Sequence, residues 1–200
     1  MVRKYAATEI RQKQIVDAAC KVIIKYGTEH VTVKRIAREV GISETAIYRH
    51  FKSKKDVMSL LVEQIEERLF GDLTRAVASG FTPLETLDNV MKSHLSSIEQ
   101  RKGISFQVIA EIMGLGDKKL NAKVSRVIDK YIENLKNLLV EGVKSGEVSK
   151  DIDLEAAATA LFGIIQGLVN IWALNNYSFD LQQKYTTLWN IFRKAIVNHE

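Results

Sequence analysis

The sequence contains little of what β-rich, disulfide-bonded or secreted proteins need. One proline and 11 glycines in 200 residues are too few for the many turns of a sheet protein, and this favours helices. The single cysteine, Cys20, excludes an internal disulfide and a cysteine-based zinc site, and it fits a reducing cytoplasm. No apolar run follows the basic first residues, so we expect no secretory signal and a cytoplasmic protein.

Sequence motifs of catalysis are missing as well. The chain has no G-x-S-x-G motif, no cysteine–histidine pairing and no phosphate-binding loop. Its histidines, at positions 30, 50, 94 and 199, lack the spacing of metal ligands. We therefore expect that the protein is not an enzyme and that it uses neither a metal nor a cofactor.

Charge is distributed unevenly along the chain. Residues 1–60 contain 13 lysines and arginines against 6 acidic residues, a net charge of +7, whereas the rest of the chain carries −2. A basic N-terminal part on a nearly neutral body is typical of a protein that binds a polyanion. A solvated basic surface has the same composition, so charge alone leaves both interpretations open.

Apolar residues recur with the period of a helix along most of the chain. The first predicted helix has an apolar face up to Tyr26 and ends at Gly27, and the next three begin at the capping residues Thr32, Ser43 and Ser53. Further breaks are predicted at residues 78–87, 114–119, 144–153 and 175–180. The sequence therefore predicts an all-α fold, with a small basic bundle followed by a larger one.

The second and third predicted helices are separated by three residues, 41–43, which is the arrangement of a helix-turn-helix. Gly41 suits this turn because the backbone conformation there is unfavourable for residues with a Cβ atom. The angle between the two helices is set by the inward-facing residues Ala37, Val40, Ile42 and Ile47. The second helix then presents an outward face that can approach DNA base edges closely, with Glu44, Thr45, Ala46 and Arg49.

The same region resembles the TetR family of transcriptional regulators. The segments IAREVGIS and AIYRHF, together with Gly27, Thr32 and Lys54, stand in the order and spacing that this family uses. The resemblance covers roughly residues 9–69, and the rest of the chain is similar only in being helical and of suitable length. It implies an N-terminal three-helix DNA-binding domain, a larger C-terminal helical domain, and a regulator that binds double-stranded DNA.

The resemblance also implies which residues contact DNA. Positions that contact the DNA backbone in the family are matched here by Thr32, Tyr48, His50 and Lys54. Positions that face bases are matched by Lys34, Glu44, Thr45, Ala46 and Arg49, and Ser43 completes the expected DNA-binding set. Arg49 can pair bidentately with guanine, and Ala46 or the Thr45 methyl group can meet a thymine methyl. Many family members have glycine or proline in place of Thr45, a difference expected to alter specificity rather than docking.

Several of these residues have an alternative structural role. Tyr48 can pack partly against the first helix, and His50 can hydrogen-bond within the bundle. Lys34 can be an ordinary solvated lysine. Glu44 can accept a hydrogen bond from a cytosine amino group or stabilise the positive end of its own helix. The sequence alone leaves these alternatives open.

Residues 154–174 form an almost uniformly apolar segment that is long enough to span a bilayer. Its polar residues and the lack of flanking lysine clusters favour a soluble helix buried on nearly all sides, so we expect no membrane association. A stripe of small residues permits close helix contact, at Ala156, Ala160, Gly163 and Gly167. Together with residues 182–199, which include Trp189, the segment resembles the dimer-forming helix pair of the family, and we expect a homodimer.

The family resemblance further implies a small-molecule effector bound inside the larger bundle. Polar or soft groups interrupt apolar faces at the candidate ligand-binding residues, which are Met91, His94, Phe106, Ile109, Glu111, Met113, Phe162, Gln166, Asn170 and Trp172. For each of them, core packing or surface exposure is the alternative. The apolar bias favours a hydrophobic or amphipathic effector.

The predicted organisation follows chain order. Residues 1–53 form the helix-turn-helix domain, residues 54–78 a connecting helix, and residues 79–200 the ligand-binding and dimerisation domain. The predicted function is a repressor that binds a palindromic operator as a dimer and is released by its effector.

Overall fold

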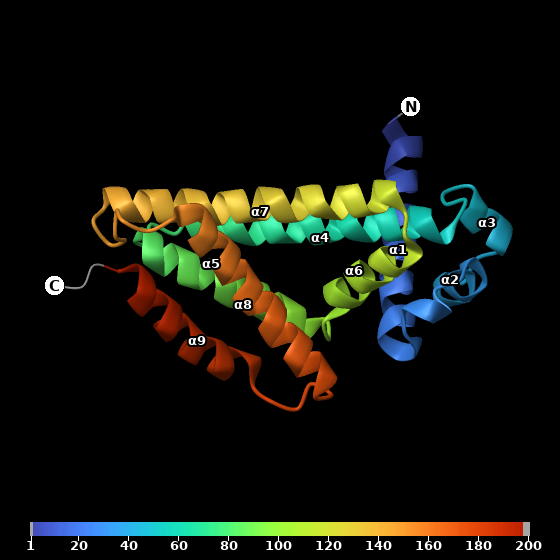
Figure 1. Ribbon diagram of the computed structural model, residues 1–200. Helices are drawn as coiled ribbons and strands as arrows, with labels where there is room; N and C mark the ends of the chain where they lie inside the picture. Colours follow the sequence, from blue (N-terminus) through green and yellow to red (C-terminus); the bar gives the residue numbers. More distant parts are fainter. Residues whose placement is uncertain (1, 198–200) are drawn as a thin grey trace. The chain divides into compact units, whose positions relative to one another are not determined.

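The computed structural model describes residues 2–197, with side chains described from Ile10 onward. Within this range the chain forms α-helices and one short 3₁₀ helix, η1, and no β-strand (Figure 1). The elements are α1 (Val2–Tyr26), η1 (Thr28–His30), α2 (Val33–Val40), α3 (Glu44–Tyr48), α4 (Lys54–Val77), α5 (Pro83–Gln100), α6 (Ile104–Leu115), α7 (Lys118–Lys144), α8 (Leu154–Leu174) and α9 (Leu181–Ile196). The predicted all-α fold class is confirmed. Residues 198–200, which the predicted C-terminal domain includes, lie outside the described residues.

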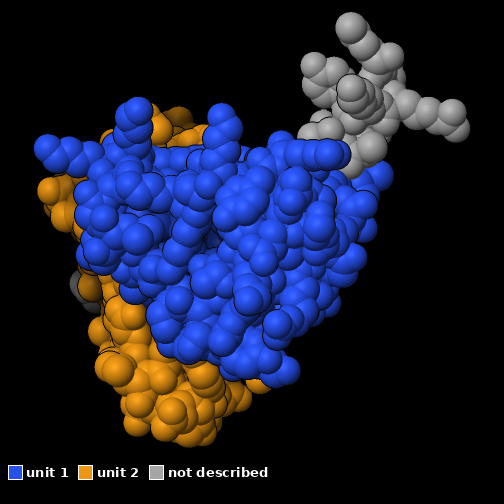
Figure 2. Space-filling view, turned by 90° about the vertical axis from the view of Figure 1, so that its right-hand side faces the viewer, with its two compact units in different colours: residues 1–65, 104–124 blue, residues 66–103, 125–200 orange. Residues whose placement is uncertain are grey.

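The chain divides into two compact units, which are coloured in Figure 2. Unit 1 comprises Met1–Ile65 and Ile104–Val124, and unit 2 comprises Glu66–Gly103 and Ser125–Glu200. Helix α6 thus belongs to the same unit as α1–α3, and it packs against α1 and η1. The predicted ranges 1–53, 54–78 and 79–200 do not anticipate this division, and as functional boundaries they stay predictions.

The core of unit 1 lies between the amphipathic helices α1, α2 and α4 and the short helix α3. Ile47, the one buried residue of α3, has 0% of its surface exposed, and burial of such a side chain stabilises a fold by about 1.5–3 kcal/mol. Other buried apolar residues of unit 1 are Ile15, Ala19, Val22, Ile23, Ile36, Ala37, Phe51, Val57, Met58 and Leu61. This core fixes the direction of α3.

Side-chain caps define the ends of the short helices. The hydroxyl of Thr32 accepts a hydrogen bond from the Arg35 amide at the start of α2, and that of Ser43 accepts one from the Ala46 amide at the start of α3. Gly41 ends α2 with φ of 76°, in the left-handed region that favours glycine. These three predictions from the sequence are confirmed.

The helix that carries Tyr48 is shorter than predicted. Arg49 was expected on the face of this helix, but α3 ends at Tyr48, and Arg49 is its C-cap. His50 and Phe51 still donate their amides to the Ile47 carbonyl, at 2.8 and 2.9 Å, so the chain makes one last tight turn. After this turn the amides of Lys52 and Ser53 donate to the Asp56 carboxylate at the start of α4.

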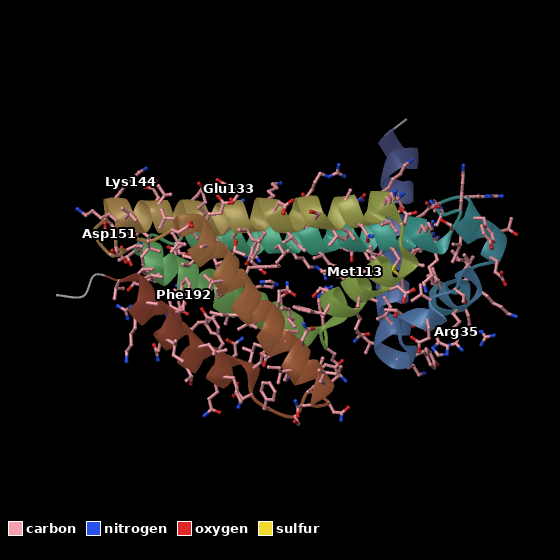
Figure 3. The ribbon with its side chains drawn as sticks, in the orientation of Figure 1. Arg35, Met113, Glu133, Lys144, Asp151 and Phe192 are labelled. Carbon is pink, nitrogen blue, oxygen red and sulfur yellow. The ribbon has the colours of Figure 1, made fainter. Side chains whose placement is uncertain are left out.

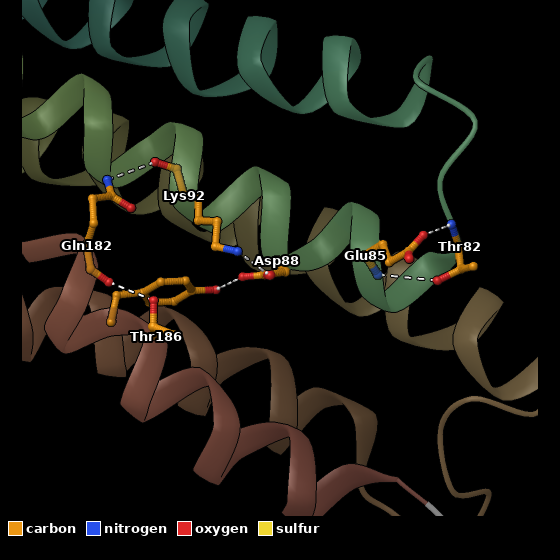
Figure 4. Close-up of polar contacts among 7 residues, drawn as sticks. Thr82, Glu85, Asp88, Lys92, Gln182 and Thr186 are labelled. Carbon is orange, nitrogen blue, oxygen red and sulfur yellow. Dashed lines mark hydrogen bonds and ion pairs between the residues drawn. The ribbon is translucent and has the colours of Figure 1, made fainter.

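In unit 2, α5 begins with a complete capping box. The Thr82 hydroxyl accepts from the Glu85 amide and the Glu85 carboxylate accepts from the Thr82 amide, with Pro83 in the first turn (Figure 4). The other end of the same figure shows polar contacts between α5 and α9. There the Tyr185 hydroxyl donates to Asp88 at 3.0 Å and the Gln182 amide group donates to the Lys92 carbonyl at 3.3 Å.

One helix break was not predicted. Residues 101–103 separate α5 from α6, and both Lys102 and Gly103 have a positive φ, 50° and 68°. A left-handed lysine is unusual, and the sequence around it carries no strong turn signal. The predicted breaks at residues 78–87, 114–119, 144–153 and 175–180 are confirmed.

The sequence predicted that residues 154–174 are buried on nearly all sides. Within its own chain, however, α8 is buried on one face only. Its buried residues lie on one face, at Ala157, Ala158, Leu161, Ile165, Leu168, Val169 and Trp172. In the described part of the chain, α8 is the helix whose length and mean hydropathy of 1.6 suffice for a membrane span. A single such helix is weak evidence for a membrane protein, because core helices of soluble proteins have the same composition.

Candidate DNA-binding surface and effector site

Helix α3 directs most of its side chains away from the core of unit 1. Ser43, Glu44, Thr45, Tyr48 and Arg49 are exposed, with 51% of the surface of Tyr48 accessible. Ala46 and His50 are half-buried, and Thr32 and Lys34 on the preceding segment are exposed. About half of the surface of this large aromatic side chain is accessible, beside an exposed arginine, so the accessible half is available to a partner.

The two capping hydroxyls can serve DNA at the same time as their helices. An oxygen of Thr32 or Ser43 accepts the amide hydrogen of its helix, at 3.2 Å in both cases, and its own hydrogen remains free to donate. Phosphate oxygens are acceptors that take such donors from the N-termini of helices. Both residues are exposed, which such a contact requires.

Arg35 is a basic residue of this region that already has a partner within the chain. Its guanidinium group lies over the Tyr26 ring, 4.7 Å from the ring centre, and stabilises the packing of α2 on α1 (Figure 3). Lys54 is also occupied, because its ammonium group lies 2.6 Å from a carboxylate oxygen of Glu111 on α6. The sequence gives no sign of this ion pair, since the partners are 57 positions apart.

In unit 2, two of the predicted ligand residues gather around a tyrosine that the sequence did not single out. The Tyr131 hydroxyl on α7 lies 3.3 Å from Nδ1 of His94, and the two rings meet edge to face. Phe162 and Phe70 also present ring edges to Tyr131, with ring centres 6.1 and 6.3 Å away. Burial lowers the pKa of His94 to about 4 and raises that of Tyr131, so both groups are neutral at pH 7.

The other predicted ligand residues do not join this aromatic cluster. Trp172 donates its indole N–H to the Phe179 carbonyl at 3.0 Å and packs on Tyr177. Met91 is fully buried, Gln166 is half-buried and Asn170 is exposed. The remaining four belong to α6 in unit 1, and of these Met113 is 68% exposed (Figure 3); the other three are Phe106, Ile109 and Glu111.

A polar groove of about 410 Å³ lies between α4 and α5 in unit 2. Three arginines line it, Arg68, Arg75 and Arg101, and its other residues are Asp72, Ser93, Ser96, Ser97 and Gln100. Asp72 pairs with Arg75, which leaves the groove with an excess of positive charge and several hydroxyl donors. The sequence analysis missed this groove. Its residues recur with helical spacing on each of two helices, but this spacing indicates a shared site only when the two helices are known to be neighbours.

The small-residue stripe of α8 lies on the exposed face of that helix. Ala156, Ala160, Gly163 and Gly167 are all exposed, and a Cβ atom added at either glycine would meet nothing within 4 Å. Trp189, which the sequence placed at the dimer interface, is instead packed inside its own chain with 6% of its surface exposed. Its ring contacts the rings of Tyr185 and Phe192, of which Phe192 is labelled in Figure 3. Trp189 lies on the buried face of α9 with Leu181, Tyr185, Phe192 and Ile196. Helix α9 packs on α5 and α8.

Comparison with known proteins connects both units to one family. Residues 15–60 match the bacterial regulatory proteins of the tetR family, and residues 51–195 match the C-terminal region of YsiA-like proteins. The fatty acid metabolism regulator protein of Bacillus subtilis is 27% identical over 168 residues, which are 84% of this chain and 86% of that protein. The nucleoid occlusion factor SlmA of Marinomonas sp. (strain MWYL1) is 23% identical over 187 residues, 94% and 95% of the two chains.

A solved structure gives the same result. The transcriptional regulator FadR from Bacillus subtilis, in complex with stearoyl-CoA, superposes with a TM-score of 0.80 and 26% identity, covering 90% of this chain and 96% of that one. The fold points to the same family as the two sequence matches, because it has a helix-turn-helix in α2 and α3 and is helical in the rest of the described chain. The protein belongs to the TetR family of bacterial transcriptional regulators.

Proposed function

We propose that the protein is a repressor that binds a palindromic operator as a homodimer in the cytoplasm and is released by a long-chain acyl-coenzyme A thioester. The observation that supports DNA binding is the exposed face of α3, where Tyr48 and Arg49 are exposed beside the buried Ile47. In this proposal Arg49 reads a base, and Thr32, Tyr48 and His50 bind phosphates.

The exposed apolar surface of α8 and α9 supports the dimer in this proposal. Besides the small-residue stripe, Ile171 is 55% exposed, Leu174 is 84% exposed and Ile191 on α9 is 63% exposed. Burial of such a surface between two copies would stabilise their association. The α3 helices of the two protomers, held about 34 Å apart, can then bind successive major grooves of a palindrome.

Two features of unit 2, the arginine-lined groove and the aromatic cluster around Tyr131, support the proposed class of effector. An acyl-coenzyme A has a long apolar chain and three phosphate groups. The arginine-lined groove offers donors for phosphates, and the neutral cluster around Tyr131 offers an apolar environment for a chain. The relative whose structure contains stearoyl-CoA supports the same class. The coupling between effector and DNA is expected to be about 1–3 kcal/mol and must be reciprocal.

The experiment selects bound duplexes from a random DNA pool and then titrates the complex with effectors. Stearoyl-CoA, the ligand in the solved structure of the related FadR, should release DNA at roughly micromolar concentration. Free fatty acid and free coenzyme A should each require at least about tenfold more, because each lacks one part of the ligand. Release by the free fatty acid alone would contradict the role of the arginine-lined groove.

A further inference from the structure

The first residue of α4 is tied to α6 inside unit 1. The ammonium group of Lys54 donates to Oε1 of Glu111 at 2.6 Å, and the two side chains are only 28% and 19% exposed. The hydrogen bond from Lys54, with a smaller contribution from Thr28, lowers the pKa of Glu111, so the carboxylate is ionised at neutral pH. The pair is therefore a partly shielded, charge-assisted hydrogen bond rather than a loose surface contact.

Lys54 is also the residue of α4 that the family resemblance assigns to a DNA phosphate. The affinity of a lysine for DNA comes largely from its charge, since binding releases counterions that had condensed on the phosphates. A lysine whose charge is already neutralised by a carboxylate contributes little of this term. The two roles of Lys54 therefore compete for the same ammonium group.

A second pair beside it provides a matched comparison. The neighbouring Lys55 donates to Asp117 at 2.7 Å. Asp117 is at the same time fixed at the start of α7, where its other oxygen accepts from the amides of Lys119 and Leu120. Lys55 is 54% exposed, and no DNA contact is assigned to it. The two pairs thus have the same charges and neighbouring positions, but only one contains a predicted DNA contact.

We propose that Glu111 competes with DNA phosphate for Lys54, so that the placement of α6 sets the strength of one sequence-independent DNA contact in each protomer. This inference rests on the proposed DNA-binding function. Helix α6 follows the turn at residues 101–103 directly, and in this proposal the turn is the covalent route by which a shift of the end of α5 would reach the helix that carries Glu111. The acid on α6 would then act on DNA affinity without touching DNA.

The test measures the salt dependence of DNA binding by the full-length protein, for its selected operator and for an unrelated duplex. Glu111→Gln keeps the size of the side chain and removes its charge. It should tighten binding to both duplexes roughly 3- to 10-fold at low salt and steepen the slope of log K against log salt by about 0.9 for each protomer. Lys54→Gln should weaken binding to both, and in its background Glu111→Gln should have no effect.

Asp117→Asn is the control, because it removes the same charge from beside Lys55 and should leave the slope unchanged. The inference is wrong if Glu111→Gln weakens DNA binding, if it leaves the slope unchanged, or if Asp117→Asn has an equal effect. If Lys54→Gln has no effect on a protein that does select an operator, this inference fails and the proposed function stands. If no duplex is selected at all, the proposed function fails. Thermal unfolding of each variant checks that the fold is intact.

Discussion

The hydroxyl of Tyr131 and Nδ1 of His94 lie 3.3 Å apart in the buried interior of unit 2, where neither group is ionised at neutral pH. The Tyr131 hydroxyl donates to Nδ1 when the imidazole carries its proton on Nε2, and it accepts from Nδ1 in the other tautomer. The arrangement has a direct consequence for stability, because protonation of His94 would place a charge in the core.

The first prediction concerns pH. His94 has a pKa of about 4 in the folded chain, below its value of about 6.5 when unfolded, so the unfolded state binds the proton more readily. Stability is therefore complete above about pH 6.5 and is lost as the pH falls towards 4. The free energy of unfolding should decrease by about 2 kcal/mol between pH 7.5 and pH 5 through this group. Urea unfolding at the two pH values, compared with His94→Gln, isolates the effect; an equal decrease in the variant would refute it.

The second prediction separates affinity from specificity on α3. Tyr48→Phe removes one hydroxyl from a side chain that is 51% exposed, so the fold should be unaffected and binding to all sequences should weaken equally. Arg49→Ala should instead relax the base preference at one position of each half-site, with a loss of about 1–3 kcal/mol for the preferred base. Competition binding against single-base variants of the operator distinguishes the two patterns. Identical specificity profiles for Arg49→Ala and the wild type would rule out base reading by Arg49.

The third prediction tests the proposed dimer. Gly163→Leu should produce monomers without harming the single chain, since a Cβ atom at this position meets nothing and a glycine within a helix is unfavourable by about 1 kcal/mol relative to better helix formers. Analytical ultracentrifugation measures the change. Gly114→Leu on α6 is the matched control, because that glycine is equally open but belongs to another helix, in unit 1. A Gly163→Leu protein that remains dimeric would show that the interface lies elsewhere.

The fourth prediction concerns the arginine-lined groove. Arg68→Gln and Arg101→Gln should each raise the acyl-coenzyme A concentration needed for DNA release by about tenfold, the effect of losing one charge-assisted hydrogen bond. Arg126→Gln, which changes an exposed arginine of α7 outside the groove, should have no effect. Isothermal titration with the thioester gives the same comparison without DNA. Equal affinities for all three variants would exclude the groove as the phosphate site.

The sequence predicted the features that depend on near neighbours. Thr32, Gly41, Ser43 and Thr82 mark helix ends through contacts within four residues, so their roles can be read without knowing the fold. The break at Lys102 was missed because that conformation is set by its surroundings and not by a residue type that favours it. Local rules therefore gave the boundaries and the fold class.

The features that were missed depend on which helices become neighbours. The pair of Lys54 with Glu111 and the cluster around Tyr131 join residues that are far apart in the sequence. Trp189 was predicted at the dimer interface and is buried within its own chain, because an aromatic residue on an apolar helix face fits a core and an interface equally well. Long-range packing decides between these alternatives, and helical periodicity does not contain that information.

The exposed apolar face of α8 has a consequence for the amount of protein present. If the face is covered only by a second copy, folding and association are linked, and mass action makes stability depend on concentration. Each tenfold increase in protein would then add about 1.4 kcal/mol of stability per dimer, and the unfolding temperature would rise with it. Newly made chains at low abundance would be the most vulnerable to unfolding and proteolysis, so the abundance of the regulator would help to determine its own lifetime.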